Sequence, residues 1–265
     1  MSRRLRLDAE LVRRGLARSR EQAAELISSG RVAVAGQTAA KPASQVSLDS
    51  AITVQEMSDR PDYVSRGGHK LAGALAQFAD LSVAGRRCLD AGASTGGFTD
   101  VLLRAGAGHV VAADVGYGQL AWSLQTDPRV TVLDRVNIRA LQPAQVAPAP
   151  GLVVADLSFI SLTLVLAALA GCAAPDADFL LMVKPQFEVG KDMVSGGVVR
   201  DPELRAAAVT KVATAAAQLG LGVAGVTASP LPGPSGNVEY FLWLRHGAPP
   251  LQQSDLAGAI AAGPQ

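Results

Sequence analysis

The chain has 265 residues, enough for one large domain or for a domain of ordinary size with a small one beside it. Hydrophobic residues make up 49% and charged residues 18%, which is typical of a globular protein with a buried core. Two cysteines exclude a disulfide framework and a four-ligand zinc site, and the N-terminus lacks the apolar segment of a secretory signal. We therefore expect a cytoplasmic protein without a metal.

The N-terminal segment is basic, although the whole chain has a net charge of only +1. Its first 31 residues contain eight arginines and four acidic residues, a local charge of +4. Residues 6–34 are typical of two short helices and a strand, with Asp8 and Ser19 as the helix caps, and a second strand at 51–56 closes the unit. The segment predicts a small α+β phosphate-binding domain over residues 1–59.

Pro61 marks an expected linker at residues 60–64, because proline interrupts helices and restricts the residue before it. Beyond it, strand and helix patterns alternate. Strands are predicted at 86–90, 109–114, 130–134, 151–156, 178–184, 222–228 and 238–245, and helices at 68–79, 96–105, 118–125, 162–172 and 202–219. This alternation predicts a doubly wound, Rossmann-like α/β domain over residues 65–246 with seven strands in a mostly parallel sheet. The last two strands have no helix between them and are expected to pair antiparallel.

Two further segments are an uncharged stretch in the middle of the chain and a C-terminal tail of biased composition. Residues 157–175 carry no charge and approach the ~18-residue length of a spanning helix. Asp156 and Asp176 bound them, however, and no aromatic belt or basic cluster flanks them. We interpret them as a strand end, a loop and a core helix, and we expect no membrane partner. Residues 247–265 are rich in alanine, glycine, proline and glutamine and are expected to form a flexible tail.

A glycine-rich turn follows the first strand of the α/β domain and predicts a nucleotide-like ligand. Its residues are Asp90, Ala91, Gly92, Ala93, Ser94, Thr95, Gly96 and Gly97. Asp114 ends the next strand, where an acidic residue can hydrogen-bond a ribose hydroxyl pair. Ser94 replaces the glycine that makes room for a pyrophosphate in dehydrogenases, which weakens an NAD-dependent alternative. With an acid before the turn, at Asp90, the pattern favours S-adenosylmethionine, whose ammonium group suits a carboxylate.

The adenine of such a cofactor has two candidate partners after the third strand of the domain. Asp134 or Asn137 could hydrogen-bond it, and an ordinary surface loop explains both residues almost equally well.

Four charged residues lie where this architecture places its active site. Asp156 and Lys184 each end an apolar strand, and a charge there is costly unless it has a partner, so we expect them to face a cleft together. Lys70 lies in the helix before the first strand, and Glu239 opens the last strand. Taken singly, Lys70 and Glu239 are more simply explained as solvated or ion-paired surface residues.

Together the four residues suggest methylation of a ribose 2′-hydroxyl. A free lysine titrates near ~10.4, and a neighbouring ammonium and partial desolvation lower that value. Our hypothesis gives Lys184 the role of general base, assisted by Lys70, which also holds phosphate, while Asp156 and Glu239 orient the amine and the hydroxyl. The strand end at 156–159 lacks the prolines common in base-methylating enzymes, which favours an oxygen target.

Long strings of this sequence resemble the TlyA-type (haemolysin A-like) ribosomal RNA 2′-O-ribose methyltransferases. The N-terminal part resembles the S4 RNA-binding fold, and the remainder is similar to this family at residues 64–71, 89–99, 114–120, 155–161, 183–188 and 233–239. The resemblance implies a class I S-adenosylmethionine-dependent methyltransferase that modifies a cytidine of 16S rRNA in the 30S subunit, and in some members also 23S rRNA in the 50S subunit. It also implies an effect on capreomycin and viomycin action, and it places Lys70, Asp156, Lys184 and Glu239 at the family's catalytic tetrad.

Within this reading, arginines are expected to contact RNA phosphates. They are Arg3, Arg4, Arg6, Arg18, Arg20 and Arg66. Two other functions stay open at this point. One is a non-catalytic RNA- or ribosome-binding protein that keeps the methyltransferase fold, and the other is a membrane-active haemolysin, as the family's older name suggests.

Overall fold

The computed structural model describes residues 4–17, 19–55, 61–190, 196–233 and 235–264. The chain divides into two compact units, Met1–Asp62 and Tyr63–Gln265, and this division falls inside the expected linker at 60–64. In the part of the chain that is described, no helix is long and apolar enough to cross a membrane.

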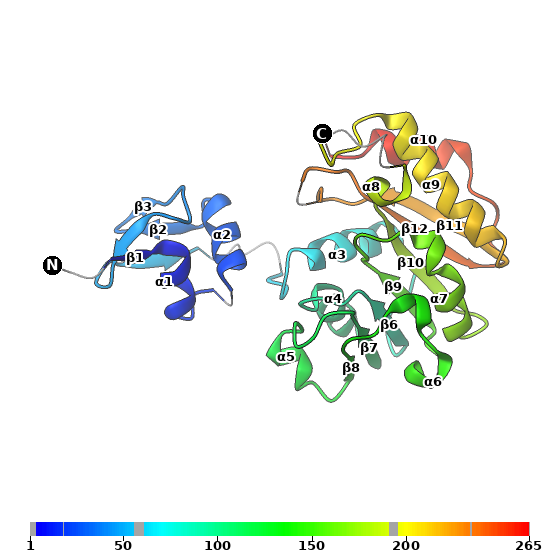
Figure 1. Ribbon diagram of the computed structural model, residues 1–265, viewed down its shortest axis with the longest axis horizontal. Coiled ribbons are helices and arrows are strands. Elements are labelled where there is room, and N and C mark those ends of the chain that lie inside the picture. The colour runs from blue at the N-terminus through cyan, green and yellow to red at the C-terminus, as the bar shows by residue number, and fades with distance from the viewer. Residues whose placement is uncertain (1–3, 18, 56–60, 191–195, 234, 265) are drawn as a thin grey trace. The chain divides into compact units, whose positions relative to one another are not determined.

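The N-terminal unit packs two helices on short strands (Figure 1). Its elements are β1 (Arg4–Arg6), α1 (Leu7–Arg13), α2 (Arg20–Ser28), β2 (Val32–Val34), β3 (Gln37–Thr38), β4 (Gln45–Ser47) and β5 (Ile52–Val54). β1 pairs antiparallel with β4, and β2 lies between β3 and β5 in a second antiparallel sheet. Leu7, Leu11, Ile27 and Val32 are buried and form the core with the inner face of α2.

The two predicted helix caps have different outcomes. Ser19 caps α2 as expected, because its Oγ accepts a hydrogen bond from the backbone N–H of Gln22 at 3.1 Å. The prediction for Asp8 is wrong: α1 already begins at Leu7, and Asp8 lies buried in its first turn. Its carboxylate is occupied by two arginine side chains, Arg6 and Arg20.

The C-terminal unit is a seven-stranded sheet between two layers of helices. Its strands are β6 (Arg87–Ala91), β7 (His109–Ala113), β8 (Val130–Leu133), β9 (Leu152–Ala155), β10 (Asp178–Val183), β11 (Leu221–Ala228) and β12 (Tyr240–His246). The strand order is β11-β12-β10-β9-β6-β7-β8. All neighbouring pairs are parallel except those of β12, which runs antiparallel to both β10 and β11, as predicted for the last two strands.

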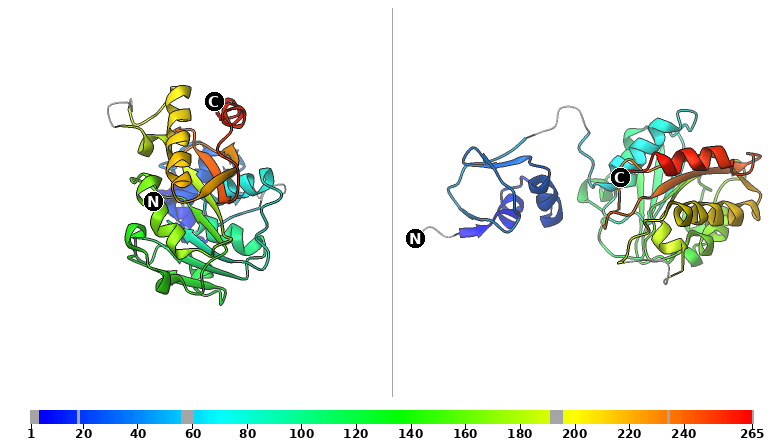
Figure 2. Two further views of the ribbon diagram at one scale, coloured as in Figure 1. Left: turned by 90° about the vertical axis from the view of Figure 1, so that its right-hand side faces the viewer. Right: turned by 90° about the horizontal axis from the view of Figure 1, so that it is seen from above.

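Helices cover both faces of this sheet, because its strands are apolar on both sides. The helical elements are α3 (Gly67–Gln77), α4 (Gly97–Arg104), α5 (Trp122–Gln125), η1 (Ile138–Ala140), α6 (Pro143–Val146), η2 (Leu162–Leu164), α7 (Leu166–Cys172), α8 (Pro185–Glu188), α9 (Pro202–Ala217) and α10 (Gln253–Ala261). One core cluster packs β6 and β9 against α3, α4 and α5, and the other packs them against α7, α9 and α10. Figure 2 shows α3 and α9 on opposite sides of the sheet.

The expected flexible tail is the clearest error in the predicted fold. Residues 253–261 form α10, and Leu256 and Ala259 are buried against the β11 side of the sheet. Alanine and glycine give this segment little hydrophobic contrast, so its helical pattern was weak in the sequence. Two predicted helices are also shorter than expected, because 118–125 is helical only from Trp122 and 162–172 is divided at Val165.

Candidate active site

The glycine turn between β6 and α4 holds a backbone that side chains rarely tolerate. Gly92, Ser94 and Gly96 have φ values of 86°, 48° and 97°. A Cβ on Gly92 would lie 2.8 Å from the backbone oxygen of Asp156, closer than real Cβ atoms come to any neighbour. The absence of a side chain therefore lets the turn approach the end of β9, as a close-fitting ligand loop requires.

Asp90 is the buried carboxylate of this turn. It lies in β6 with no exposed surface, and its Oδ2 accepts a hydrogen bond from Thr99 Oγ1 at 2.7 Å. Its Oδ1 is buried and accepts no hydrogen bond from the described residues. Burial raises the pKa of Asp90 to about 7, against the opposing effect of the Thr99 hydrogen bond. An orphaned buried carboxylate oxygen of this kind suits a cationic ligand group.

Asp114 connects the glycine turn to the end of the next strand. Its Oδ2 accepts a hydrogen bond from the backbone N–H of Ser94 at 2.8 Å, and its Oδ1 accepts one from Gly116 at 2.7 Å. Each carboxylate oxygen has a further lone pair, so Asp114 can still accept hydrogen bonds from two hydroxyl groups. The residue lies where the sequence placed a ribose contact.

The two adenine candidates differ in their local roles. Asp134 Oδ2 accepts a hydrogen bond from the backbone N–H of Gly118 at 3.0 Å, which ties it to the loop that follows Asp114. Asn137 is exposed and caps η1, because its Oδ1 accepts a hydrogen bond from the backbone N–H of Arg139 at 3.0 Å. Asp134 is thus tied to the loop that follows Asp114, whereas Asn137 caps the start of η1.

The four charged residues form two ion pairs. Lys70 Nζ lies 2.5 Å from Glu239 Oε2, and both side chains are buried. Lys184 Nζ lies 2.6 Å from Asp156 Oδ1, so the expected contact between these strand ends is confirmed. Glu239 directly precedes β12 and is not its first residue, a small correction to the predicted strand.

The two pairs lie close together around the start of α3. A Cβ on Gly67, in the first turn of α3, would lie 3.8 Å from Asp156 Oδ2. Lys70 lies one turn further along the same helix. A buried charge without a partner costs several kcal/mol, and each ammonium here is neutralised by one carboxylate. The arrangement fixes the amine of each lysine and its partner carboxylate beside the glycine turn.

The loop after β9 contains site residues that sequence reasoning missed. Ser158 Oγ accepts a hydrogen bond from Lys184 Nζ at 2.9 Å and gives this amine a second anchor. Phe159 is 92% exposed, has a φ of 64° and lies beside Phe187, with the two rings tilted by 49° and their centroids 5.2 Å apart. Both residues lie in the string 155–161 that resembles the family, but the hydrogen bond of Ser158 and the exposure of Phe159 do not follow from it, because they are properties of the folded loop.

Glu188, which sequence reasoning also missed, holds the end of the loop that follows β9. Its Oε2 accepts a hydrogen bond from Ser161 Oγ at 2.5 Å, and its Oε1 accepts one from the backbone N–H of Leu162 at 2.7 Å. Glu188 is buried, and burial raises its pKa. It therefore joins α8, which follows Lys184, to the segment that follows Asp156.

The predicted RNA-binding arginines fall into several groups. Arg3 and Arg18 lie outside the described residues. Arg4 is exposed, and Arg6 and Arg20 both bind Asp8. Arg66 precedes α3 and donates a hydrogen bond to the backbone oxygen of Pro232 at 3.1 Å, which ties it to the loop before Glu239. Among the described residues, no group of histidine, cysteine and acidic side chains could hold a metal ion.

Comparison with known proteins identifies both units. The model of the FtsJ-like methyltransferase family matches residues 63–246, and the model of the S4 domain matches residues 5–52. The 16S/23S rRNA (cytidine-2′-O)-methyltransferase TlyA of Mycobacterium tuberculosis is 67% identical over 92% of this chain and 91% of its own length. Hemolysin A of Brachyspira hyodysenteriae is 36% identical over 89% of this chain and 98% of its own.

A solved structure extends this similarity to the whole fold. A protein of Streptococcus thermophilus described as a hemolysin superposes with a TM-score of 0.78 at 35% identity, covering 98% of this chain and 96% of that one. Strand order, glycine turn, paired lysines and acids, and the family match over 63–246 agree with one another. The chain belongs to the FtsJ-like methyltransferase family and carries an S4 domain in front of the methyltransferase domain.

Proposed function

We propose that this protein transfers a methyl group from S-adenosylmethionine to the 2′-hydroxyl of a cytidine in ribosomal RNA. The observation that carries the proposal is the pair of ion pairs, Lys70 with Glu239 and Lys184 with Asp156, beside a glycine turn at the carboxyl edge of the sheet. The name of the 67% identical relative, a 16S/23S rRNA (cytidine-2′-O)-methyltransferase, supports the choice of nucleotide and of 16S rRNA, with 23S rRNA as a second substrate.

The residues of the turn fit this methyl donor. The donor supplies an electrophilic methyl group on a positively charged sulfur when it is bound. The unpartnered Oδ1 of Asp90 is suited to its ammonium group, and the remaining lone pairs of Asp114 are suited to its ribose hydroxyls. The turn Gly92–Gly97 brings backbone close to it, and Asp134, with Asn137 as the alternative, is the candidate partner of its adenine.

The four charged residues then have separate tasks. Lys184, held by Asp156 and Ser158, would act through its neutral amine as the base that takes the proton of the ribose 2′-hydroxyl, and the bound donor would supply the methyl group to that oxygen. Lys70, fixed by Glu239, places a positive charge beside the RNA phosphate. Positioning dominates this reaction, because a hydroxyl is a weak nucleophile that must be aligned with the methyl carbon.

The exposed aromatic of the Asp156–Ser161 loop is consistent with an RNA substrate. Phe159 presents nearly its whole ring to solvent from a strained backbone, and such backbone outliers cluster at functional sites. Aromatic rings are common stacking partners of unstacked RNA bases. We include Phe159 among the residues that contact the target nucleotide.

The test is transfer of labelled methyl groups to purified 30S and 50S subunits that lack prior modification. We expect label in the 30S RNA, and label in the 50S RNA if the specificity is dual. Lys184→Ala should lose transfer while its cofactor affinity, measured by calorimetry, is unchanged. A variant with wild-type turnover would refute the role of Lys184.

The same assay separates the alternatives. Cofactor binding without label in either subunit would favour a non-catalytic ribosome-binding protein. Leakage from liposomes at protein concentrations that give no methyl transfer would favour a haemolysin.

A further inference from the structure

The first helix of the S4 domain contains two buried acidic residues, and each binds two arginines. The side chain of Asp8 is 6% exposed and binds Arg6 and Arg20. Glu10 has no exposed side-chain surface and binds Arg13 and Arg14. A negative charge weakens the attraction of this surface for RNA. We therefore expect each carboxylate to act through the arginines that it holds in place.

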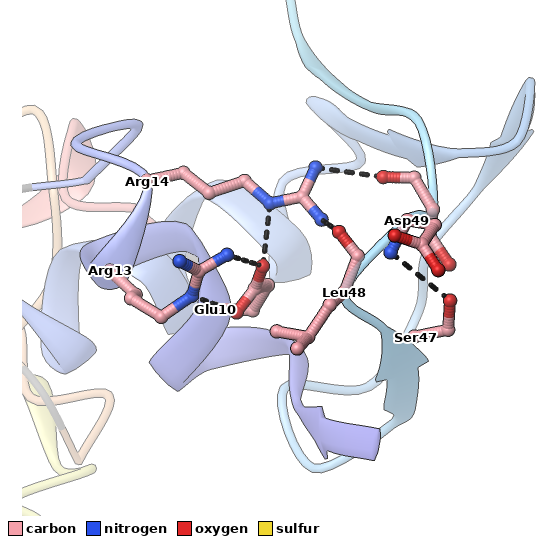
Figure 3. Close-up of polar contacts among 7 residues, drawn as sticks. Glu10, Arg13, Arg14, Ser47, Leu48 and Asp49 are labelled. Carbon is pink, nitrogen blue, oxygen red and sulfur yellow. Dashed lines mark hydrogen bonds and ion pairs between the residues drawn. The ribbon is translucent and has the colours of Figure 1, made fainter. Parts of the chain in front are cut away.

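The Glu10 group stabilises the fold (Figure 3). Arg14 donates from Nε to Glu10 at 2.6 Å, from Nη1 to the backbone oxygen of Ser50 at 2.7 Å and from Nη2 to that of Leu48 at 2.7 Å. Each nitrogen of its guanidinium group is thus bonded to protein, and the side chain is only 22% exposed. Arg14 joins α1 to the turn after β4 and has little capacity left for a ligand.

The Asp8 group is arranged differently. Arg6 donates from Nε and Nη2 to both carboxylate oxygens, at 3.1 and 2.8 Å. Among the described residues, Arg20 donates only from Nη2, to the same Oδ2 at 3.0 Å. The two side chains are 46% and 59% exposed, and Nη1 of each and Nε of Arg20 make no further hydrogen bond within the described part of the chain. One buried oxygen therefore holds two partly exposed guanidinium groups next to each other, each with N–H donors that have no partner among the described residues.

We propose that Asp8 is a positioning residue: because it binds both Arg6 and Arg20, which are already expected to contact RNA, it holds them as a clamp for a single RNA phosphate. The inference rests on the proposed function for the identity of the ligand. Arginine presents planar, paired N–H donors that match phosphate oxygens. Two flexible arginines lose conformational entropy when they bind a ligand, and prior fixation on Asp8 removes part of that cost.

Asp8 remains ionised at any pH suitable for a binding assay. The hydrogen bond from Arg6 lowers the pKa of Asp8 far below its usual range, although burial acts in the opposite direction. The carboxylate is thus a fixed anchor, and only mutation can remove its charge.

Asp8→Asn separates positioning from charge, because it makes the surface more positive by one unit and leaves the side chain the same size. If charge alone governed binding, the variant would bind RNA more tightly and with a steeper salt dependence. The clamp predicts the opposite. We expect the Kd for 30S subunits, measured with the full chain by filter binding between 50 and 200 mM salt, to rise about tenfold, and the salt slope to become shallower by about one. Equal or tighter binding by Asp8→Asn would overturn the proposal.

Arg20→Ala and Arg13→Ala provide a matched pair that does not depend on the fold of the Asp8 variant. Both remove one exposed arginine from the same domain, and the Arg13 side chain is 54% exposed, comparable with that of Arg20. We expect Arg20→Ala to lose about tenfold in affinity and Arg13→Ala to stay within about threefold of wild type. Equal losses would show that only total charge matters and would overturn the clamp.

Failure of the clamp and failure of the proposed function give different results. If wild type methylates 30S subunits and Arg20→Ala binds them like Arg13→Ala, the clamp alone is wrong. If wild type binds the subunits with the expected ranking of variants but transfers no methyl group, the clamp stands and the proposed activity is wrong.

Discussion

Replacing Gly92 by alanine tests the geometry that joins the cofactor turn to the catalytic residues. The φ of 86° is unfavourable for any residue with a Cβ, and the left-handed region costs an alanine roughly 1–2 kcal/mol. The new Cβ would also lie 2.8 Å from the backbone oxygen of Asp156, whereas ordinary van der Waals contact begins at 3.4 Å. Either the turn or the end of β9 must move by about 0.6 Å.

This displacement adds a second, larger cost. Overlap in a packed region typically costs about 1–3 kcal/mol, so we expect a total loss of about 2–5 kcal/mol in the free energy of unfolding. Asp156 carries the ion pair to Lys184, and a displacement of about 1 Å from productive geometry can reduce turnover by ~10²-fold. We expect kcat/KM for methyl transfer to fall by between ~10- and ~100-fold.

Gly85→Ala is the matched control, because Gly85 has a similar φ of 72° and a Cβ there would meet nothing within 4 Å. The difference between the two variants in the free energy of unfolding, measured in urea, gives the cost of the steric overlap at Gly92, because both variants carry the same cost of a positive φ. We expect Gly85→Ala to lose only about 1–2 kcal/mol, with unchanged kcat/KM. If Gly92→Ala and Gly85→Ala were equal in stability and activity, the proposed contact between the glycine turn and Asp156 would have no functional role.

Three further predictions concern a carboxylate, a loop anchor and the C-terminal helix. Burial raises the pKa of Asp90 from 3.8 to about 7, so ionisation of this group should reduce the stability of the cofactor-free protein as pH rises from about 4 through 7. Cofactor affinity should increase over the upper part of this range. Asp90→Asn should remove the first trend in thermal melts and the second in calorimetry. Glu188→Gln leaves one acceptor oxygen for two donors and should lower kcat more than it changes KM in methyl-transfer assays, whereas a lower Tm with unchanged kcat would limit Glu188 to a structural role. Leu256→Ala should reduce the free energy of unfolding in urea by about 2–5 kcal/mol, and no change would restore the flexible-tail interpretation.

The alternation of strands and helices could be predicted because it depends on the hydrophobic pattern of short stretches of sequence. Residues 152–155 form an uninterrupted apolar run, which indicates a strand buried on both faces, and the structure places it in the middle of the sheet. The strands β1, β3 and β4 contain at most one apolar residue each and show no strand pattern, whereas β2 and β5, of similar length, are richer in apolar β-branched residues and could be predicted. The helix α10 was missed for a related reason, since its apolar face consists mainly of alanines around Leu256.

Some residues of the candidate site could likewise be located from the sequence, and others could not. Asp90, Gly92 and Asp114 could be placed from sequence, because each follows from its position at a strand end. The partner of Lys70 could not be derived from spacing, because Glu239 is 169 residues away and only the packing of α3 near the start of β12 brings them together. Likewise, exposure of Phe159 depends on how its loop leaves β9.

The arginines of the S4 domain show what tertiary structure alone decides. By itself the sequence determined a basic N-terminal segment, a glycine turn after the first strand of an α/β domain and charged residues at strand ends, because these features depend on neighbouring residues. Arg20 and not Arg14 was expected to contact RNA, but the sequence supplies no physical reason for this difference, because the two residues are chemically identical. The fold makes Arg14 a fully hydrogen-bonded cross-link and leaves Arg20 an exposed donor, since buried carboxylates and nearby backbone oxygens determine which N–H groups stay available to a ligand.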